Sequence, residues 1–387
     1  EFIRRSDPHD VRRLPVFNPK RGSIQNLCKS AKLCNRLNNV DFFIRNVNIQ
    51  DDEIDESNKD VNVFFASLLH MQKHVQAGLV DIGRLDQIIR LAQLMKEDAD
   101  DEHLPISFIT CLIKSPLQMV DDTTEKLIAI AGKKIPVVIS SSPQGGSTAP
   151  IREEGMVSLI NAEILAGVVL SQLVNPGTPV LYGALPVRAR LDTLHDLYGS
   201  PDFIHYNQDC VQMAKFYGIP CYSTAGVADA KVPGVQAVVE KIFSQLAVAQ
   251  TGAQYIHYAF GLLDKTNVFS PLQAVLDDEH ISIVRHIVRQ PAFSKPEADK
   301  AVKEIQQVAG SSTQLFARYI RKALREGFVS PPYSFETAET EDAVLLKAHE
   351  RLQEYLNAPE ELPEKSVIDA VYNEIEGLLP WDAFTIS

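Results

Sequence analysis

The sequence Ile135-Pro-Val-Val-Ile-Ser-Ser141 begins a strand–helix–strand pattern that ends at Pro179-Val-Leu-Tyr-Gly183. Both runs are mostly apolar, which is typical of strands covered on both faces. Between them, apolar residues keep the spacing of one buried helical stripe: Val157, Ile160, Ile164 and Val168. The stretch therefore predicts two parallel strands joined by a crossover helix.

The same alternation recurs from about residue 40 to residue 290. Eight runs have the composition of strands: Val40–Val47, His74–Val80, Ile106–Leu112, Ile135–Ser141, Pro179–Gly183, Asp202–Tyr206, Ile219–Ser223 and Gln254–Tyr258. Two more intervening segments show helical stripes, one with Leu85, Ile88, Ile89, Ala92 and Met95, the other with Val235, Val238, Ile242 and Leu246. Alternation of strands and helices predicts an α/β protein with a parallel sheet.

Eight strand–helix units favour a closed (β/α)8 TIM barrel over an open, doubly wound sheet, which stays the alternative. The sequence has no GxGxxG after the first strand, so the dinucleotide-binding version of the open sheet is disfavoured. We expect residues 1–39 to form an N-terminal segment packed on the barrel, residues 40–290 to form the barrel, and residues 291–387 to form a C-terminal helical appendage. Four helices without strands between them are predicted there: Pro296–Ala309, Leu315–Arg325, Asp342–Leu356 and Ser366–Leu379.

Composition excludes several classes of protein. The 387 residues carry a formal net charge of −12, which disfavours nucleic acid as a partner. The longest apolar run, Ile164–Leu170, has seven residues, and a membrane span needs about twenty. The five cysteines form no CxxC pair, so we expect free thiols in the cytoplasm. The chain begins with Glu1, and we expect a further N-terminal piece to precede it.

Common catalytic signatures are absent from the sequence. There is no GxxxxGK[ST], no HExxH and no GxSxG. His70 and His74 could share a helix face, but His74 falls in a predicted strand, and zinc needs three or four ligands. We therefore expect no metal site.

The carboxyl ends of barrel strands are where the chemistry of such folds lies. Reading those ends gives these candidates: Asn46, Gln144, Gly145, Gly146, Ser147, Thr148, Tyr182, His257, Tyr258 and Phe260. The two glycines would allow a ligand to approach the backbone closely, or they would serve an ordinary turn. Aromatic rings at one mouth could surround a quaternary ammonium by cation–π attraction. Strand alternation sends only one of His257 and Tyr258 into the lumen, unless the strand has ended there.

Four segments carry a resemblance to a known family. They are Ser142-Pro-Gln-Gly-Gly-Ser-Thr-Ala-Pro150, Asn161-Ala-Glu-Ile-Leu-Ala-Gly167, Gln172-Leu-Val-Asn-Pro-Gly-Thr-Pro-Val-Leu-Tyr-Gly183 and Gly252-Ala-Gln-Tyr-Ile-His257. Together they resemble the trimethylamine methyltransferase family, the corrinoid-dependent methylamine methyltransferases. The resemblance implies a TIM barrel that transfers a methyl group from a methylated amine to the Co(I) of a separate corrinoid protein. The chain contains no pyrrolysine, so it resembles the branch that includes glycine betaine methyltransferases.

Within that resemblance, each candidate has an implied role. Tyr182, Tyr258 and Phe260 would hold the ammonium, and Gln144, His257 and Asn46 would bind a substrate carboxylate. The loop of Gly145, Gly146, Ser147 and Thr148 would let the corrin ring approach, although the chain itself would bind no cofactor directly. We also expect a homo-oligomer. The chain departs from the family pattern in two ways. Asp264 stands where Glu is expected, and the segment 310–319 lacks the histidine that family members have there.

Two other functions stay open at this point. One is a different TIM-barrel enzyme, such as a lyase or aldolase, which would need a metal or a Schiff-base lysine such as Lys231 near the seventh strand. The other is a non-catalytic barrel that binds a methylamine or a corrinoid protein.

Overall fold

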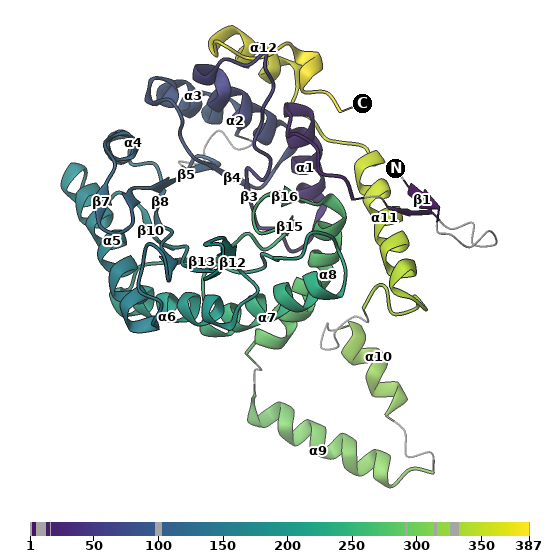
Figure 1. The fold of residues 1–387 in the computed structure, drawn as a ribbon. Helices are drawn as coiled ribbons and strands as arrows, with labels where there is room; N and C mark the ends of the chain where they lie inside the picture. The colour runs from purple at the N-terminus through teal and green to yellow at the C-terminus, as the bar shows by residue number, and fades with distance from the viewer. Residues whose placement is uncertain are drawn as a thin grey trace.

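Seven parallel strands form the centre of the molecule, in the spatial order β14-β13-β10-β8-β5-β4-β3. The computed structural model describes residues 2–4, 13–15, 17–96, 103–290, 293–312, 316–325 and 333–386. The strands are β3 (Phe42–Ile44), β4 (His74–Ala77), β5 (Ile106–Cys111), β8 (Val137–Ser141), β10 (Val180–Ala184), β13 (Cys221–Thr224) and β14 (Tyr255–His257). The sheet is curled, with the helices on its outer, convex side, and its concave side is called the lumen below (Figure 1).

Eight helices surround this sheet: α1 (Ile24–Arg36), α2 (Lys59–His70), α3 (Leu85–Met95), α4 (Asp121–Gly132), α5 (Glu153–Val174), α6 (Pro201–Tyr217), α7 (Val235–Thr251) and α8 (Pro271–Val288). Helices α2 to α7 each connect one strand of the sheet to the next along the chain. Shorter strands lie in the loops that follow the strands of this sheet: β6 (Ile113–Lys114), β7 (Gln118–Met119), β9 (Gln144–Gly145), β11 (Val187–Ala189), β12 (Asp196–Leu197), β15 (Leu262–Leu263) and β16 (Val268–Phe269). The predicted α/β alternation is confirmed.

The sheet does not close into a barrel. In the described part of the chain, no strand pairing joins the edge strands β3 and β14. The rings of Phe42 and Tyr255 meet across this seam with centroids 4.7 Å apart. A closed (β/α)8 barrel would have an eighth strand between β14 and β3, followed by an eighth helix. Helix α1 contacts β3, α2 and α8, so it occupies the position of that eighth helix. The structure is thus a curled half-barrel of TIM type, and the predicted eight-stranded closure is not observed.

The predicted strand Asp202–Tyr206 is wrong, and the other seven are confirmed. The segment belongs to α6, whose N-cap Ser200 accepts a hydrogen bond from the backbone N–H of Phe203. Pro201 occupies the first turn, where its missing N–H has no cost, and Gly218 ends the helix in the left-handed conformation. Phe203 and Tyr206 are both buried at helical spacing, so caps and packing outweigh the β-rich composition.

Helix α5 is, among the described residues, the one helix long and apolar enough by length and composition to cross a membrane. It packs against β8, β10, α4 and α6, and Met156, Ile160 and Ile164 are fully buried in these contacts. A crossover helix on a parallel sheet is expected to be apolar for this reason.

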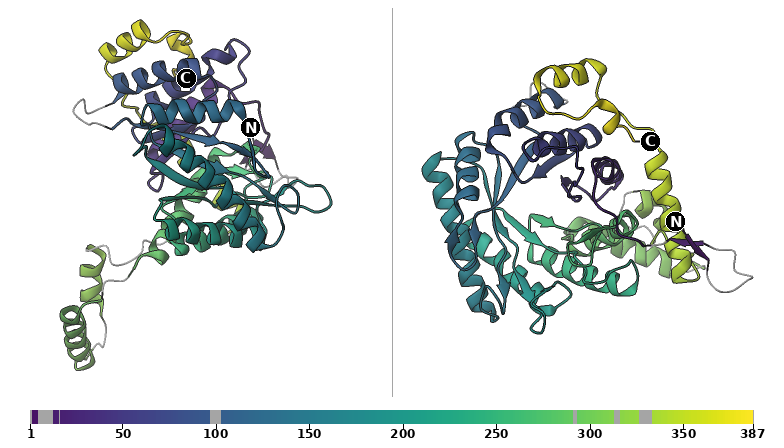
Figure 2. Two further views of the ribbon diagram at one scale, coloured as in Figure 1. Left: turned by 90° about the vertical axis from the view of Figure 1, so that its left-hand side faces the viewer. Right: turned by 45° about the horizontal axis from the view of Figure 1, so that its top comes forward.

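The four predicted C-terminal helices are confirmed as α9 (Lys295–Ala309), α10 (Ala317–Arg325), α11 (Glu341–Asn357) and α12 (Lys365–Glu374). Helix α11 packs on α1 and α8, and α12 packs on α3, whereas α9 and α10 project from the rest of the molecule (Figure 2). Near the N-terminus, β1 (Phe2–Arg4) pairs with β2 (Arg13–Pro15) beside α11. The domain boundaries at residues 39 and 290 stay a prediction.

Candidate functional site

The register of the parallel strands identifies the side chains that face the lumen. Phe42 is paired with His74, Tyr222 with Tyr255, and Thr224 with His257. Residues in register share one face of a sheet. The opposite face contacts the helices, as the Phe108–Phe64 ring contact shows. The lumen therefore receives Phe42, Ile44, His74, Gln76, Ser107, Ile109, Cys111, Val138, Ser140, Leu181, Gly183, Tyr222, Thr224, Tyr255 and His257.

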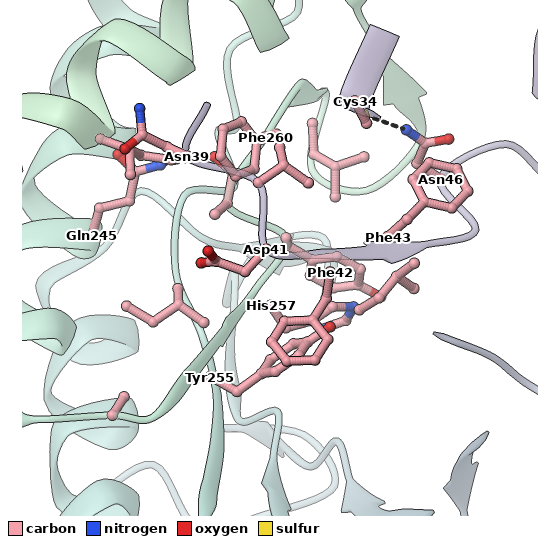
Figure 3. Close-up of a pocket in the computed structure, with 18 of the residues that line it drawn as sticks. Cys34, Asn39, Asp41, Phe42, Phe43, Asn46, Gln245, Tyr255, His257 and Phe260 are labelled. Carbon is pink, nitrogen blue, oxygen red and sulfur yellow. Dashed lines mark hydrogen bonds between the residues drawn. The ribbon is translucent and has the colours of Figure 1, made fainter. Parts of the chain in front are cut away.

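Five of the rings at this face form a continuous series, the lumen aromatic row, which consists of Phe42, Tyr255, Tyr222, His257 and Tyr258. Successive ring centroids are 4.7 Å (Phe42–Tyr255), 4.6 Å (Tyr255–Tyr222), 4.9 Å (Tyr222–His257) and 3.3 Å (His257–Tyr258) apart. Figure 3 shows Phe42, Tyr255 and His257 lying together at the wall of a pocket. The row spans the seam from β3 to the end of β14.

Three polar atoms beside these rings are buried without a hydrogen-bond partner among the described residues: Tyr222 OH, Thr224 Oγ1 and His257 Nδ1. Buried polar groups in folded proteins almost always have a partner, so this group marks a place for a ligand or an ordered water. Burial lowers the pKa of His257 well below its usual 6.5. The imidazole is therefore neutral near pH 7, and none of these three groups carries a charge there.

A cavity of about 500 Å³ occupies the seam beside the lumen aromatic row. Its walls come from β3, β14, α7 and α8, and they include Phe42, Tyr255, His257, Tyr258 and Gln245 (Figure 3). This volume lies in the range of ligand pockets, which also combine apolar walls with a few polar groups.

His257 and Tyr258 both lie at the site because the strand ends between them. Strand β14 stops at His257, and Tyr258 adopts a left-handed backbone with φ of 67°. The change of direction brings the Tyr258 ring onto that of His257 instead of to the opposite face. Burial raises the pKa of Tyr258 to about 12, so its phenol stays protonated. Phe260, two residues later, lines the cavity near α8.

The expectation that Tyr182 faces the mouth is wrong. Its ring is fully buried between β10 and the helices, and its hydroxyl donates a 3.1 Å hydrogen bond to Asn161 on α5. Register explains this, because Tyr182 pairs with Ile139, which packs outward against Gly167 of α5. Asn46 borders the cavity, but its side-chain amide turns toward α1. Its Oδ1 accepts a 2.7 Å hydrogen bond from the hydroxyl of Ser30 on that helix.

The loop from Gln144 to Thr148 is a self-contained turn. Thr148 Oγ1 accepts from the Gln144 N–H, and the N–H groups of Gly146 and Ser147 donate to carbonyls of the same loop. Gly146 has φ of 91°, and a side chain on Gly145 would collide with Tyr206. Gln144 uses its amide nitrogen on Leu194 O and Asp196 Oδ1. The glycines therefore serve the turn, and Gly146, Ser147 and Thr148 form an exposed surface on the rim.

The residues proposed for the other functions lie apart. His70 contacts Glu360 and the carbonyl of Phe384, while His74 faces the lumen and contacts Ser107. The two histidines thus share no helix face. Across the described ranges, no cluster of three or more His, Cys, Asp or Glu could hold a metal ion. Lys231 is exposed in the loop after β13.

Sequence reasoning missed three members of the lumen aromatic row: Phe42, Tyr222 and Tyr255. Each lay inside a predicted strand, and strict alternation from His257 would have selected Tyr255. Tyr222 follows from the pairing of β13 with β14, which no single strand reveals. Phe42 follows from the curl that brings β3 to the seam.

One family profile and three relatives were compared with the chain. The profile of the family described as "Trimethylamine methyltransferase (MTTB)" matches residues 16–360. The chain is 27% identical to a glycine betaine methyltransferase of Desulfitobacterium hafniense (strain Y51), covering 74% of this chain and 60% of that protein. It is 29% identical to the trimethylamine methyltransferase MttB of Methanosarcina thermophila, covering 78% and 62%. For MttB of Methanosarcina barkeri (strain Fusaro / DSM 804) the values are 30%, 76% and 59%. The chain spans about three fifths of the length of these relatives.

Proposed function

This chain belongs to the trimethylamine methyltransferase family, and from that premise we propose that it transfers a methyl group from a quaternary or tertiary methylamine to a separate corrinoid protein. The substrate class we favour is betaine-like, with a trimethylammonium at one end and a carboxylate at the other. The observation that supports this most is the lumen aromatic row, together with uncharged polar atoms that lack a partner within the described ranges.

The rings would hold the ammonium. Phe42, Tyr255 and Tyr258 line the cavity, and each ring facing a cation contributes about 0.5–2 kcal/mol when water is excluded. In contrast to a carboxylate, an aromatic face binds a methylated ammonium without forming a hydrogen bond, which such a cation cannot donate when fully methylated.

The polar atoms would hold the substrate carboxylate. Tyr222 OH, Thr224 Oγ1 and His257 Nδ1 are buried and have no hydrogen-bond partner among the residues that the structure describes, and His257 lines the cavity. A hydroxyl donor and a neutral imidazole N–H can bind an anion without adding a positive charge that would repel the nearby ammonium. The carboxylate would fix the far end of the molecule and thereby aim the methyl groups toward the mouth.

For this methyl transfer, the main contribution of the protein would be to position the substrate. A corrinoid carried by the partner protein would supply the nucleophile, Co(I), for the methyl group, and the electron pair of the broken N–CH3 bond would stay on nitrogen. When the substrate is a quaternary ammonium, the leaving amine is neutral, so no protonated side chain is needed. The residues of this chain would bind the cation, orient it and exclude water.

The corrinoid protein would approach the mouth of the half-barrel. Three N–H groups of the 144–148 turn, those of Gln144, Gly146 and Ser147, already donate within residues 144–149, so this loop does not fit a phosphate cradle. Its exposed small residues, Gly146, Ser147 and Thr148, offer a surface that a flat ring could approach. A cytoplasmic location and a homo-oligomeric state stay predictions.

The test is a methyl-transfer assay. The protein is mixed with a chemically reduced corrinoid protein and, separately, with glycine betaine, other betaines and trimethylamine. We expect loss of the Co(I) absorbance, appearance of the methyl-cobalt spectrum and release of the demethylated amine. His257→Ala should lower kcat/KM at least tenfold, and Tyr182→Phe, which changes a ring outside the lumen, should leave it within twofold. Binding of the amine without any transfer would instead identify a non-catalytic amine-binding protein.

A further inference from the structure

Helix α7 turns a polar face toward the interior. Lys241, Ser244 and Gln245 are buried, whereas Val239 and Phe243 on the same helix are 46% and 62% exposed. The predicted apolar stripe of this helix, Val235, Val238, Ile242 and Leu246, therefore does not mark its buried face. A fully buried lysine is rare unless it is paired, so this face requires an explanation.

Lys241 is paired with Asp277 of α8, with 3.1 Å between Nζ and Oδ2 and both side chains completely buried. Lys241 also donates to the backbone carbonyls of Gly226 and Leu262, so all three of its donors are used. Asp277 accepts from the Gly261 N–H at 2.7 Å and from Gln273 Nε2 at 2.8 Å. Apart from Gln273, the groups that this ion pair bonds to are backbone atoms of Gly226, Gly261 and Leu262, which belong to two loops.

Those two loops follow β13 and β14. Two further residues of α7 hold them: Ser244 Oγ accepts from the Gly226 N–H at 3.0 Å, and Gln245 Nε2 donates to Ala259 O at 2.8 Å. One face of α7, together with Asp277, thus forms hydrogen bonds to the backbone of residues 226, 259, 261 and 262. We name this group the loop clamp: Lys241, Ser244, Gln245 and Asp277.

The loop after β14 carries Tyr258 and Phe260, two rings that line the cavity. Tyr258 has φ of 67° and Gly261 has φ of 73°, so the backbone here is held in the left-handed region on both sides of Phe260. A tyrosine in this region persists only when its surroundings enforce it. The loop clamp makes hydrogen bonds to the residues that flank both rings.

We propose that Lys241 and Asp277 are positioning residues for substrate binding, because they hold the Tyr258–Phe260 loop in the shape that places its rings at the cavity. This inference rests on the proposed function for the identity of the ligand. Neither side chain lines the cavity, so their effect on the ligand is transmitted through the loop backbone.

The test compares Asp277→Asn with wild type and with a double variant, Lys241→Met with Asp277→Leu. Asp277→Asn leaves the charge of Lys241 buried without its partner, which can unfold the protein. The double variant removes both charges, so it is expected to fold even where Asp277→Asn does not. The matched control is Leu91→Ala, which opens a fully buried site on α3, far along the sheet from β13 and β14.

Hydrogen exchange of the unliganded protein is the first measurement. We expect peptides covering residues 225–228 and 258–264 to exchange about tenfold faster in both clamp variants, while peptides from α3 do not change. A uniform rise over the whole chain, or no rise in the two loops, would overturn the proposal. This measurement needs no ligand, so it decides the clamp even if no methylated amine binds and the proposed function fails.

Glycine betaine binding and turnover are the second measurement. The clamp variants should raise the Kd and the KM about tenfold and change kcat less than threefold, under conditions where each protein is folded. Leu91→Ala should leave the Kd within twofold despite its lower stability. If Leu91→Ala weakens binding as much as the clamp variants do, the pair has only a structural role and the proposal is wrong.

Discussion

Tyr222 and Tyr255, which are paired in register on β13 and β14, stack with ring centroids 4.6 Å apart and planes 19° apart. The Tyr222 hydroxyl is buried without a partner in the described part of the chain. Tyr222→Phe should therefore leave the free energy of unfolding within about 0.5 kcal/mol, because no hydrogen bond is lost. The same change should weaken glycine betaine binding about tenfold, measured by calorimetry.

Tyr182→Phe is the matched control, since it removes a hydroxyl of the same kind from the outward face. That hydroxyl donates to Asn161, so its loss should destabilise the protein by about 1 kcal/mol and leave binding unchanged. If the two variants affect binding equally, the Tyr222 hydroxyl does not belong to the substrate site.

His257 should make binding insensitive to pH near neutrality. Burial holds its pKa well below 6.5, so the imidazole is uncharged on both sides of that value. We expect the Kd for glycine betaine to vary less than twofold between pH 6 and pH 8. Binding that strengthens as the pH falls through 6.5 would show that a protonated histidine attracts the carboxylate, contrary to this account.

His74 should make the fold sensitive to acid. Its Nε2 lies 2.7 Å from Ser107 Oγ, which accepts from Gln76 Nε2 and whose own proton is free to serve an unprotonated Nε2. Burial lowers the pKa of His74 from 6.5 to about 4. The unfolded chain therefore binds the proton first, and the stabilisation present above pH 6.5 is lost as the pH falls toward 4.

The expected loss between pH 7 and pH 4.5 is about 2 kcal/mol from this residue. Urea unfolding at several pH values checks it, with His74→Gln as the comparison, because glutamine does not titrate. The free energy of unfolding of the variant should fall about 2 kcal/mol less than that of wild type over this range. Parallel curves for the two proteins would rule out His74 as the source.

Glu163 links α5 to two strand ends. Its carboxylate accepts from Ser115 Oγ and the Leu117 N–H, both at 2.9 Å, and from Ser141 Oγ. Glu163→Gln would turn an N–H2 group toward one of these donors, which should lower the free energy of unfolding by about 2–3 kcal/mol. Chemical denaturation measures this, and Glu154→Gln, an exposed change in the first turn of α5, should cost less than about 0.5 kcal/mol.

Local patterns predicted most of the fold. Seven strands and the helices between them could be read because each carries its own apolar run or stripe. Asp202–Tyr206 could not, because its helical state depends on the Ser200 cap and on burial of Phe203. The open seam is equally invisible in the sequence, since closure depends on the pairing of β3 with β14, strands far apart along the chain.

The site was predicted in part for the same reason. His257, Tyr258 and Phe260 border the cavity, because the end of a strand can be recognised locally. Tyr182 lies within β10 and Asn46 follows β3, but the direction of each side chain depends on neighbours on α5 and α1. The buried face of α7 could not be read from its apolar stripe, because Lys241, Ser244 and Gln245 are buried where they bond to two loops, whereas Val235 of the stripe is 67% exposed.

The most direct test of the central claim compares two ligands that differ in one atom. Glycine betaine and 3,3-dimethylbutanoate share their shape and carboxylate, but the second has carbon in place of the positively charged nitrogen. If aromatic rings at the seam recognise the cation, calorimetry should show glycine betaine binding at least tenfold more tightly, in line with about 1–2 kcal/mol of cation–π attraction. Equal or tighter binding of 3,3-dimethylbutanoate would contradict the account.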